Sequence, residues 1–593
     1  MGYSRNFISE GKKEKKLYPA FKNDIGGRKY GYIDYKGQFI IEPKFNVAYN
    51  FNEHGTAIVK NNQLFGLINM KGKYILRPTY DSINEYKDNR AVYVTKDGMG
   101  VINEEGKVIT KKNYDYVQDY SEKRAVIGEN LADSTYVYGY IDVEGNEVIG
   151  LQFLEASSFK DDVALVKMKN GHFALIDREG KLISDYDYNY VGQYGDGLMV
   201  FAEDPMGPYG YINKAGQVII KPKYKSAEGF QGGIAKVSES DGFIGPYGAI
   251  NMNGTYIYSP IYSDIKYLNS NRVAIGMNLS EDKYNPTSIY ALGDVKGRII
   301  TDFKYLDIGL YHKGITYSSN EMKTFFIDKE GNVIKSLPMV KGSGELLKDE
   351  DIIIGKIDYE TYYLKPNGKV VYEPNTKIPL SSKYSVERKK FKPNINYLIY
   401  YPKIKITNEK IIEKTINDKL WELCCFMPWG DKVVEKHCGS ISPQDVLDYS
   451  YYGDFIVEFY RANLLVLDIM GYYYPFGAAH GMPYRKTPSI DLTTGEFYSI
   501  GDLFMGGVYW LGELNKIIED MIASDPQYEY VYKDGFKTIS FEQDFYVDDE
   551  NLYIYFPPYE IAPYSAGFVT FKIPFDNIQG MINKRGNFYK AFN

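Results

Sequence analysis

One short motif recurs ten times between residues 30 and 375, and this repetition limits the possible folds more than any other feature of the chain. It consists of an aromatic residue, Gly, an apolar residue, Ile, Asp or Asn, two variable residues and a second Gly. Its copies begin every 34 to 43 residues, at Tyr30, Phe65, Met99, Tyr138, Phe173, Tyr209, Tyr247, Tyr290, Thr324 and Thr361. A repeat of this period predicts small structural units that stack on their neighbours, because one such unit cannot bury its own apolar face.

Each copy predicts a β-hairpin followed by one further strand. In the first copy, Tyr30–Asp34 alternates in the manner of a strand, and Gln38–Ile41 is the return strand. The residues between them form a turn, because an Asx side chain bonds nearby backbone and Gly supplies a positive φ. The second glycine is present in every copy: Gly37, Gly72, Gly106, Gly145, Gly180, Gly216, Gly254, Gly297, Gly331 and Gly368. We interpret these glycines as structural residues of the repeat turn.

The first glycine is less regular, since Ala174, Leu292, Phe325 and Tyr362 lie at or next to its position in four copies.

Two overall arrangements are possible for the array. Propellers usually have four to eight blades of four strands, and ten units of about 35 residues suit that range poorly. The sequence therefore favours an open superhelical array over a closed, propeller-like one.

This motif resembles the WG-repeat family, in which the aromatic position before the first glycine is often Trp. The resemblance covers residues 25–375 and rests on the recurrence of the motif; Tyr, Phe or Met takes the Trp position in the clear copies. It implies a β-rich repeat array and little about activity. The sixty tyrosines of the chain suit half-buried sheet faces and contact surfaces.

The repeat ends near residue 375, and the rest of the chain has a different character. We expect an N-terminal segment at 1–24, the array at 25–375, a Pro- and Ser-containing linker at 376–395 and a second domain at 396–593. Apolar residues at helical spacing predict helices over 411–423, with Asn408 as its cap, and over 511–522, ending at Asp525-Pro526. Strand candidates surround them at 397–401, 454–459, 464–469, 552–556 and 568–573, so the fold class is mainly β with a C-terminal α+β domain.

Two segments of this second domain carry a further resemblance. They are Gly477–Gly481, with 490–496 and 500–504 after it, and the Pro- and Tyr-rich stretch 552–567. Together they resemble the extracellular domain of RsiV-type anti-sigma factors, which also accompanies the deacetylase domain of PdaC. That resemblance implies recognition of cell-envelope material, and in the anti-sigma factor it implies binding of lysozyme.

Five residues of these segments are candidates for ligand contact: His480, Gly481, Tyr559, Glu560 and Tyr564. His480 follows small residues, and Glu560 lies between prolines, so both fall in loops. A hydrolase would use the two as an acid–base pair. The alternative is structural: a His that fixes its loop through backbone contacts, and a Glu that satisfies turn amides.

Other chemistry finds little support. Cys424, Cys425, His437 and Cys438 have the side chains of a zinc site, but adjacent cysteines are badly spaced for tetrahedral ligation. A Cys425–Cys438 disulfide would require an oxidising compartment. The sequence has no phosphate-binding Gly loop and no nucleophile elbow. We therefore expect no catalytic residues, no metal, no cofactor and no enzymatic activity.

A net charge of −7 indicates no nucleic-acid partner, because such proteins usually carry a basic face. Neither a signal peptide nor a membrane span is visible, so the compartment is unknown, cytoplasmic by default, with the cell envelope or exterior as the alternative. We expect a non-catalytic recognition protein whose partner is a protein or an envelope glycan, with a lysozyme-like protein among the candidates. An intracellular protein–protein interaction scaffold is the alternative function.

Overall fold

The computed structural model describes residues 16–592, apart from 132–134, 193, 242–244, 280–286, 426–438, 440, 443–444 and 446. The chain forms two compact units. Of the described residues, the repeat unit comprises those within 16–21 and 29–373, and the C-terminal unit comprises those within 22–28 and 374–592. Each is considered by itself.

The repeat unit consists of small antiparallel sheets in chain order, ten of them among the described residues, which we call modules 1 to 10. Modules 1 to 5 contain β1 (Tyr18–Asp24), β2 (Gly27–Ile33) and β3 (Phe39–Phe45); β4 (Val47–Ala48), β5 (Thr56–Asn61), β6 (Leu64–Asn69) and β7 (Tyr74–Tyr80); β8 (Ser82–Ile83), β9 (Arg90–Thr95) and β10 (Gly98–Asn103); β11 (Tyr116–Val117), β12 (Ala125–Asn130), β13 (Tyr136–Ile141) and β14 (Glu147–Phe153); and β15 (Glu155–Ala156), β16 (Ala164–Lys167), β17 (Phe173–Ile176) and β18 (Leu182–Tyr186).

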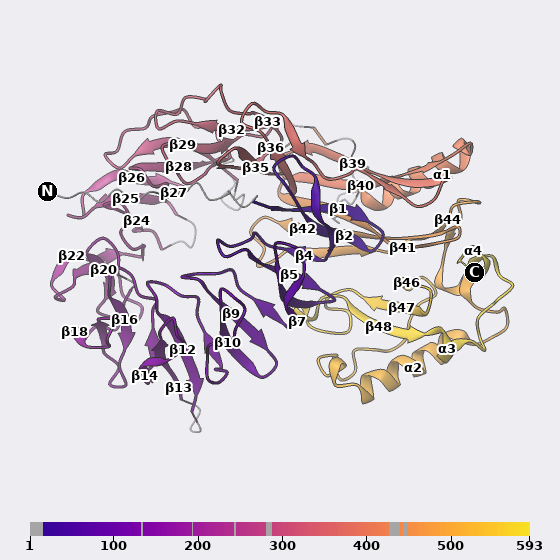
Figure 1. Cartoon of the computed structure of the whole chain (residues 1–593), viewed down its shortest axis with the longest axis horizontal. Helices are drawn as coiled ribbons and strands as arrows, with labels where there is room; N and C mark the ends of the chain where they lie inside the picture. Colours follow the sequence, from indigo (N-terminus) through magenta and orange to yellow (C-terminus); the bar gives the residue numbers. More distant parts are fainter. Residues whose placement is uncertain are drawn as a thin grey trace. The chain divides into compact units, whose positions relative to one another are not determined.

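Modules 6 to 10 repeat the plan (Figure 1). They contain β19 (Tyr190–Val191), β20 (Leu198–Ala202), β21 (Tyr209–Asn213) and β22 (Val218–Tyr224); β23 (Ser226–Ala227), β24 (Ile234–Ser238), β25 (Tyr247–Asn251) and β26 (Tyr256–Tyr262); β27 (Asp264–Tyr267), β28 (Arg272–Asn278) and β29 (Ser288–Asp294); β30 (Asp307–Ile308), β31 (Thr316–Ser319), β32 (Lys323–Ile327) and β33 (Val340–Lys341); and β34 (Gly344–Asp349), β35 (Ile352–Ile357), β36 (Glu360–Leu364) and β37 (Val370–Tyr372). Most modules thus have a short first strand beyond the three that the sequence predicts.

The second glycine of each motif makes the contact between modules. All ten have φ between 72° and 92°, the left-handed region that favours Gly. At every copy except Gly368 the turn also lies tightly against the preceding module: a Cβ added to Gly72 would lie 2.9 Å from Ile41, and one added to Gly254 would lie 3.2 Å from Ile220. This position therefore needs Gly both for its backbone angle and for the close approach.

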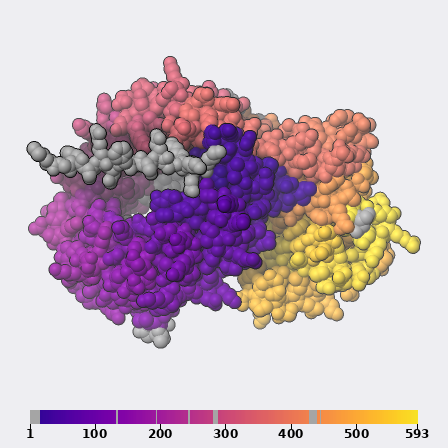
Figure 2. All heavy atoms as spheres, viewed as in Figure 1, coloured from indigo at the N-terminus to yellow at the C-terminus, as the bar shows by residue number. Residues whose placement is uncertain are grey.

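The array closes on itself, because module 1 packs against module 10 in the same way (Figure 2). A Cβ added to Gly37 would lie only 2.0 Å from the carbonyl oxygen of Val371. Tyr18 lies 5.5 Å from Tyr363 between ring centroids, in one buried cluster. The preference for an open superhelix is corrected by these contacts, and the propeller-like alternative is the one found. Sheets that each twist slightly on the last can close a circuit at ten modules as well as at eight.

The tyrosines of the motif form the core between modules. Tyr32, Tyr140 and Tyr211 are fully buried, and burial raises the pKa of each phenol. Each hydroxyl donates to a backbone carbonyl of the following module, at 2.9 Å for Tyr32 to Tyr49 and 2.8 Å for the others. A phenol satisfied in this way can be buried at little cost, so Tyr suits the apolar position that follows the first glycine of the motif.

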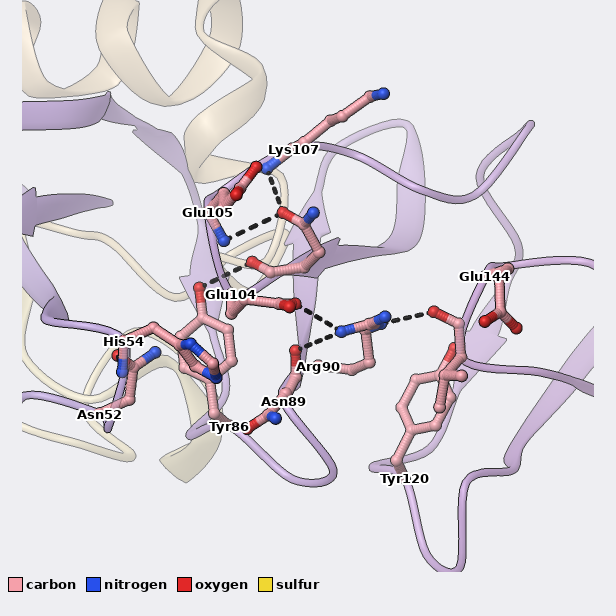
Figure 3. A network of polar contacts seen from close by, with 12 residues as sticks. Asn52, His54, Tyr86, Asn89, Arg90, Glu104, Glu105, Lys107, Tyr120 and Glu144 are labelled. Atoms are coloured by element: carbon pink, nitrogen blue, oxygen red, sulfur yellow. Dashed lines mark hydrogen bonds and ion pairs between the residues drawn. The ribbon is translucent and has the colours of Figure 1, made fainter. Parts of the chain in front are cut away.

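A recurring arginine also joins neighbouring modules (Figure 3). Arg90 donates from Nε to the carbonyl of Val143 in the next turn, at 2.5 Å, and pairs with Glu104 at 2.6 Å. Arg124 and Arg272 make the same kind of contact, to the carbonyls of residues 178 and 329. The acceptor is always a residue between the Asx and the Gly of the motif, so these variable positions contribute their backbone to the assembly.

The C-terminal unit is an α+β domain, as the sequence predicts. Its large sheet contains β38 (Lys377–Pro379), β39 (Tyr384–Asn394), β40 (Tyr397–Ile406), β41 (Tyr449–Arg461), β42 (Leu464–Pro475), β43 (Met482–Lys486), β44 (Ser489–Asp491) and β45 (Phe497–Tyr498). A second sheet contains β46 (Phe545–Val547), β47 (Asn551–Phe556) and β48 (Val569–Pro574). The helices are α1 (Lys410–Cys424), α2 (Trp510–Ser524), α3 (Phe575–Ile578) and α4 (Asn587–Phe592), with 3-10 turns η2 (Ile500–Leu503), η3 (Pro526–Tyr528) and η4 (Tyr564–Ala566).

Two details differ from the sequence-based expectation. The segment expected to be a linker, 376–395, forms β38 and β39 of the large sheet, because its Pro and Ser residues mark an edge strand and a turn rather than a disordered connection. The residue that caps α1 is Glu409, whereas Asn408 adopts a positive φ of 66° in the turn before it. Both predicted helices are otherwise present, and α2 ends before Asp525 as expected.

Candidate functional site

Four aromatic side chains of the C-terminal unit gather at one place, which we call the aromatic platform: Tyr472, His480, Tyr559 and Tyr564. Tyr472 belongs to β42, and His480 lies in the loop between β42 and β43. Tyr559 and Tyr564 lie between β47 and β48. The rings of His480 and Tyr564 are 4.1 Å apart at 30°, and those of His480 and Tyr559 are 6.0 Å apart at 27°. Two loops that are distant in sequence thus present nearly parallel rings.

Hydrogen bonds fix the orientation of this cluster. The Nδ1 atom of His480 lies 2.9 Å from the carbonyl oxygen of Gly481, which can only accept, so Nδ1 carries a proton. In the neutral ring Nε2 is then an acceptor, and the Tyr559 hydroxyl, 2.9 Å away, donates to it. The Tyr564 hydroxyl donates to the same Gly481 carbonyl at 2.9 Å. One backbone carbonyl thereby aligns two rings of the platform.

Gly481 is buried, and the atoms around it leave no room for a side chain. A Cβ at this position would lie 2.4 Å from the carbonyl oxygen of Tyr473 and 2.6 Å from the ring of Tyr472. Its N–H donates to the Tyr472 hydroxyl at 3.0 Å. The small residue therefore allows the His480 loop to lie directly on β42.

Tyr559 is the most unusual member of the platform. Its φ is 71°, which an aromatic residue rarely adopts, and its side chain is 51% exposed. Tyr472 is 42% exposed. Strained backbone of this kind costs on the order of 1–3 kcal/mol and clusters at functional sites. The fold thus holds a large apolar ring in solvent at an energetic cost.

Glu560 follows Tyr559 in the chain, and among the described residues its carboxyl makes no hydrogen bond with His480. Partial burial of its carboxyl, followed by the nearby charge of Asp544, raises the pKa of Glu560. Both ring nitrogens of His480 are occupied by Gly481 and Tyr559. The arrangement gives His480 a phenol partner instead of the carboxylate that the hydrolase hypothesis requires.

Arg485 makes a largely buried ion pair within the large sheet and also contacts rings of the second sheet. Arg485 of β43 makes a forked contact with Asp468 of β42, with Nη2 to Oδ2 at 2.8 Å. Its guanidinium also lies 4.6 Å from the ring of Tyr555 on β47 and 5.2 Å from that of Tyr546 on β46. Arg485 therefore connects the sheet that carries Tyr472 and His480 to the sheet whose loop carries Tyr559.

Sequence reasoning named His480, Gly481, Tyr559 and Tyr564, which the structure brings together. It also named Glu560, which follows Tyr559 in the chain and whose role stays a prediction. It missed Tyr472 and Arg485. The run of tyrosines in β42 was a signal for Tyr472, because alternate residues of a strand share a face. Nothing in the sequence pairs Arg485 with a partner 17 residues earlier.

The cysteine region is only partly described. Cys425 is disulfide-bonded, and Cys424 is a free thiol whose pKa burial raises to about 12. His437 and Cys438 lie outside the described residues, so the Cys425–Cys438 pairing and the zinc alternative both stay hypotheses from the sequence. Within the described part of the chain, no three His, Cys, Asp or Glu side chains gather as a metal site would require. None of the described helices is long and apolar enough to cross a membrane.

Comparison with known families agrees with this architecture. The WG containing repeat matches residues 30–64, 65–98, 99–130, 138–171, 209–242 and 247–283. A protein family of unknown function, DUF3298, which includes RsiV- and PdaC-like domains, matches residues 501–576. The chain thus carries WG repeats within residues 30–283 and a DUF3298 segment at 501–576, and both resemblances noted in the sequence are confirmed over those residues.

The solved structures that resemble this chain have low sequence identity to it. A DUF3298 family member from Bacteroides fragilis is 17% identical, with 37% of this chain and 98% of that chain covered and a TM-score of 0.28. One from Pseudomonas aeruginosa is 18% identical, with 35% and 95% covered and a TM-score of 0.26. The WD40 β-propeller domain of Doa1 is 12% identical, with 41% and 90% covered and a TM-score of 0.23. No curated protein gives a significant match.

The copies that begin at Phe173, Tyr290, Thr324 and Thr361 are not among the matched repeats, yet each lies in a module with the same plan. These are the copies in which the first glycine is lost or displaced. The second glycine is present in all ten copies, so it is the sequence feature that every module shares.

Proposed function

We propose that this protein is a non-catalytic recognition protein whose C-terminal unit binds a cell-envelope glycan at the aromatic platform. The observation that supports this proposal most is the set of nearly parallel, partly exposed rings at His480, Tyr559 and Tyr564. A sugar ring has an apolar face and a rim of hydroxyls. Flat aromatic rings can pack against the apolar face of the sugar, and the phenol and imidazole groups at their edges can hydrogen-bond its hydroxyls.

The strain at Tyr559 adds to this argument. A residue held in the left-handed region is retained only when the surrounding structure enforces it, and here the enforced ring is half exposed. An immobilised aromatic ring loses little conformational entropy on binding, which favours affinity. The repeat unit, in this proposal, supplies a rigid body that carries the recognition domain.

Tyr559→Ala should weaken binding of soluble peptidoglycan fragments to the full chain by about 30-fold, since central aromatic contacts are worth roughly 2 kcal/mol. Isothermal titration calorimetry measures the change. Tyr509→Ala is the matched control, because Tyr509 is 76% exposed, stands at the start of α2 and is no part of the platform. Its affinity should equal that of the wild type.

Two outcomes would contradict the proposal. One is fragment binding that Tyr559→Ala leaves unchanged; the other is the absence of fragment binding by the wild-type chain. A parallel titration with lysozyme separates the glycan from a protein ligand: binding of lysozyme alone, lost in Tyr559→Ala, would replace the glycan with a lysozyme-like protein.

A further inference from the structure

A pocket of about 260 Å³ lies at one corner of the large sheet in the C-terminal unit, and we call it the lysine pocket. It is bordered by β38 and the turn after it, by one face of β39 and β40, and by the first turn of α1. Four of the side chains that line it are lysines: Lys377, Lys383, Lys405 and Lys410. The acidic residue among its lining side chains is Glu413.

The lysine pocket lies in a basic stretch of an acidic chain. Residues 377–414 contain ten Lys or Arg residues and three Glu residues, whereas the whole chain has a net charge of −7. Glu413 is largely buried, and it is paired with Lys405 at 3.2 Å and with Lys410 at 3.1 Å. Its backbone partner is the N–H of Ile406, which donates to it at 2.9 Å. The negative charge of Glu413 is therefore already balanced within the pocket.

The other two lysines of the pocket have no carboxylate partner. Lys377 and Lys383 form no ion pair within the part of the chain that the structure describes. Glu387, which lies opposite Lys377 in the strand register, is itself paired with Lys389 at 2.8 Å. The pocket thus keeps an excess of positive charge, which favours an anionic ligand.

A buried serine hydroxyl adds a neutral donor to the pocket. Ser385 lies between Pro379 and Lys405 in the antiparallel register, so the three share the sheet face that lines the pocket. Ser385 is only 7% exposed, yet its hydroxyl makes no hydrogen bond with any described residue. Buried hydroxyls normally have a partner, so this one indicates a place for a ligand atom.

The turn that carries Lys383 is held by hydrogen bonds on both sides. The Ser381 hydroxyl accepts from the N–H groups of Lys383 and Tyr384, both at 3.2 Å. The Lys383 carbonyl in turn accepts from the Thr407 N–H at 3.0 Å and from the Thr407 hydroxyl at 3.3 Å. Since this backbone is already ordered, the pocket loses little conformational entropy when a ligand binds.

We propose that the lysine pocket binds a phosphate group. A phosphomonoester carries about −1.5 to −2 charge at pH 7 and three strong acceptor oxygens. The ammonium groups of Lys377 and Lys383 would balance this charge, and the Ser385 hydroxyl would donate to one of the oxygens. A carboxylate would supply a single charge and two oxygens. This inference is independent of the proposed glycan site, because it uses no residue of the aromatic platform.

Calorimetric titration of the full chain with inorganic phosphate and with glycerol 3-phosphate tests the proposal. We expect saturable binding of both at micromolar to millimolar concentration, and at least about tenfold weaker binding of acetate, which lacks the second charge. Co-sedimentation with vesicles that contain phosphatidic acid distinguishes two sources of the phosphate. Sedimentation with the vesicles assigns a lipid headgroup, whereas binding of glycerol 3-phosphate without sedimentation assigns a soluble ester.

Lys383→Gln and Ser385→Ala should each weaken binding of glycerol 3-phosphate by about tenfold, the first by removing a charge and the second by removing only a hydroxyl. Lys414→Gln is the matched control, because Lys414 is 77% exposed on α1, pairs with Asp418 and does not line the pocket. Its affinity should equal that of the wild type. Thermal unfolding of all three variants verifies the fold.

Four results would each overturn the proposal. They are the absence of saturable binding of both phosphate probes, acetate binding as tight as that of phosphate, an unchanged affinity in the folded Lys383→Gln and Ser385→Ala variants, and a loss in Lys414→Gln as large as that in Lys383→Gln. The last result would show a general effect of net charge in place of a site.

Discussion

Gly37→Ala should destabilise the repeat unit strongly, by roughly 2–5 kcal/mol. The residue has a φ of 85°, where a side chain costs about 1–2 kcal/mol. The new Cβ would also lie 2.0 Å from the Val371 carbonyl oxygen of the last module. Backbone cannot move aside as a flexible side chain does, so overpacking adds about 1–3 kcal/mol. The midpoint of denaturant-induced unfolding, followed by circular dichroism, reports this loss.

Gly171→Ala separates the two contributions. Gly171 has a nearly identical φ of 88°, but nothing lies within 4 Å of its hypothetical Cβ. Its replacement should cost only the backbone term of about 1–2 kcal/mol. Equal midpoints for the two variants would show that Gly37 does not press on module 10, and the closed array would then be wrong.

Arg485→Met should be the most damaging single change in the C-terminal unit. Asp468 is 5% exposed, and loss of its guanidinium partner would leave a buried carboxylate without compensation, at a cost of about 3–5 kcal/mol. The contacts with Tyr546 and Tyr555 would be lost as well. The unfolding midpoint of this unit should fall, and the affinity of the platform should fall with it, because its two halves belong to the two sheets that Arg485 connects.

The double variant Arg485→Met, Asp468→Leu should recover most of that stability, since an apolar pair often replaces a buried ion pair without loss. Arg298→Met is the surface control: Arg298 pairs with Asp294 but is 70% exposed, so less than about 1 kcal/mol is at stake. A loss in Arg485→Met no greater than that in Arg298→Met would exclude the proposed role of the ion pair.

Much of the repeat unit could be predicted from local sequence, because each module is encoded by a turn and its two flanking strands. The Asx-x-x-Gly turn specifies its backbone by itself, and the return strand follows from it. Closure could not be predicted in this way. It depends on a small rotation between modules that accumulates over ten copies, and on contacts such as Tyr18 with Tyr363 that are more than 340 residues apart.

At the candidate site, too, the local features could be predicted from the sequence and the long-range geometry could not. His480, Gly481, Tyr559 and Tyr564 were predictable as loop residues rich in small and aromatic side chains. Their mutual geometry depends on the long antiparallel pair β41–β42 and on the contacts that Arg485 makes with Asp468 and with the second sheet. The pairing of His480 with Glu560 stays a hypothesis from the sequence, because position in a loop between prolines does not decide which partner a side chain meets.

The closed circuit of modules is tested most directly by a distance measurement between modules 1 and 10. Spin labels at positions 36 and 367 of the full chain would report it, since Lys36 and Asn367 are exposed and the Lys365 ammonium lies 5.0 Å from the Tyr35 ring. Packed sheets are about 10 Å apart, so neighbouring modules should give a separation on the order of 10–20 Å. Ten modules in an open row would place the same labels on the order of 90 Å apart, and that result would contradict the account.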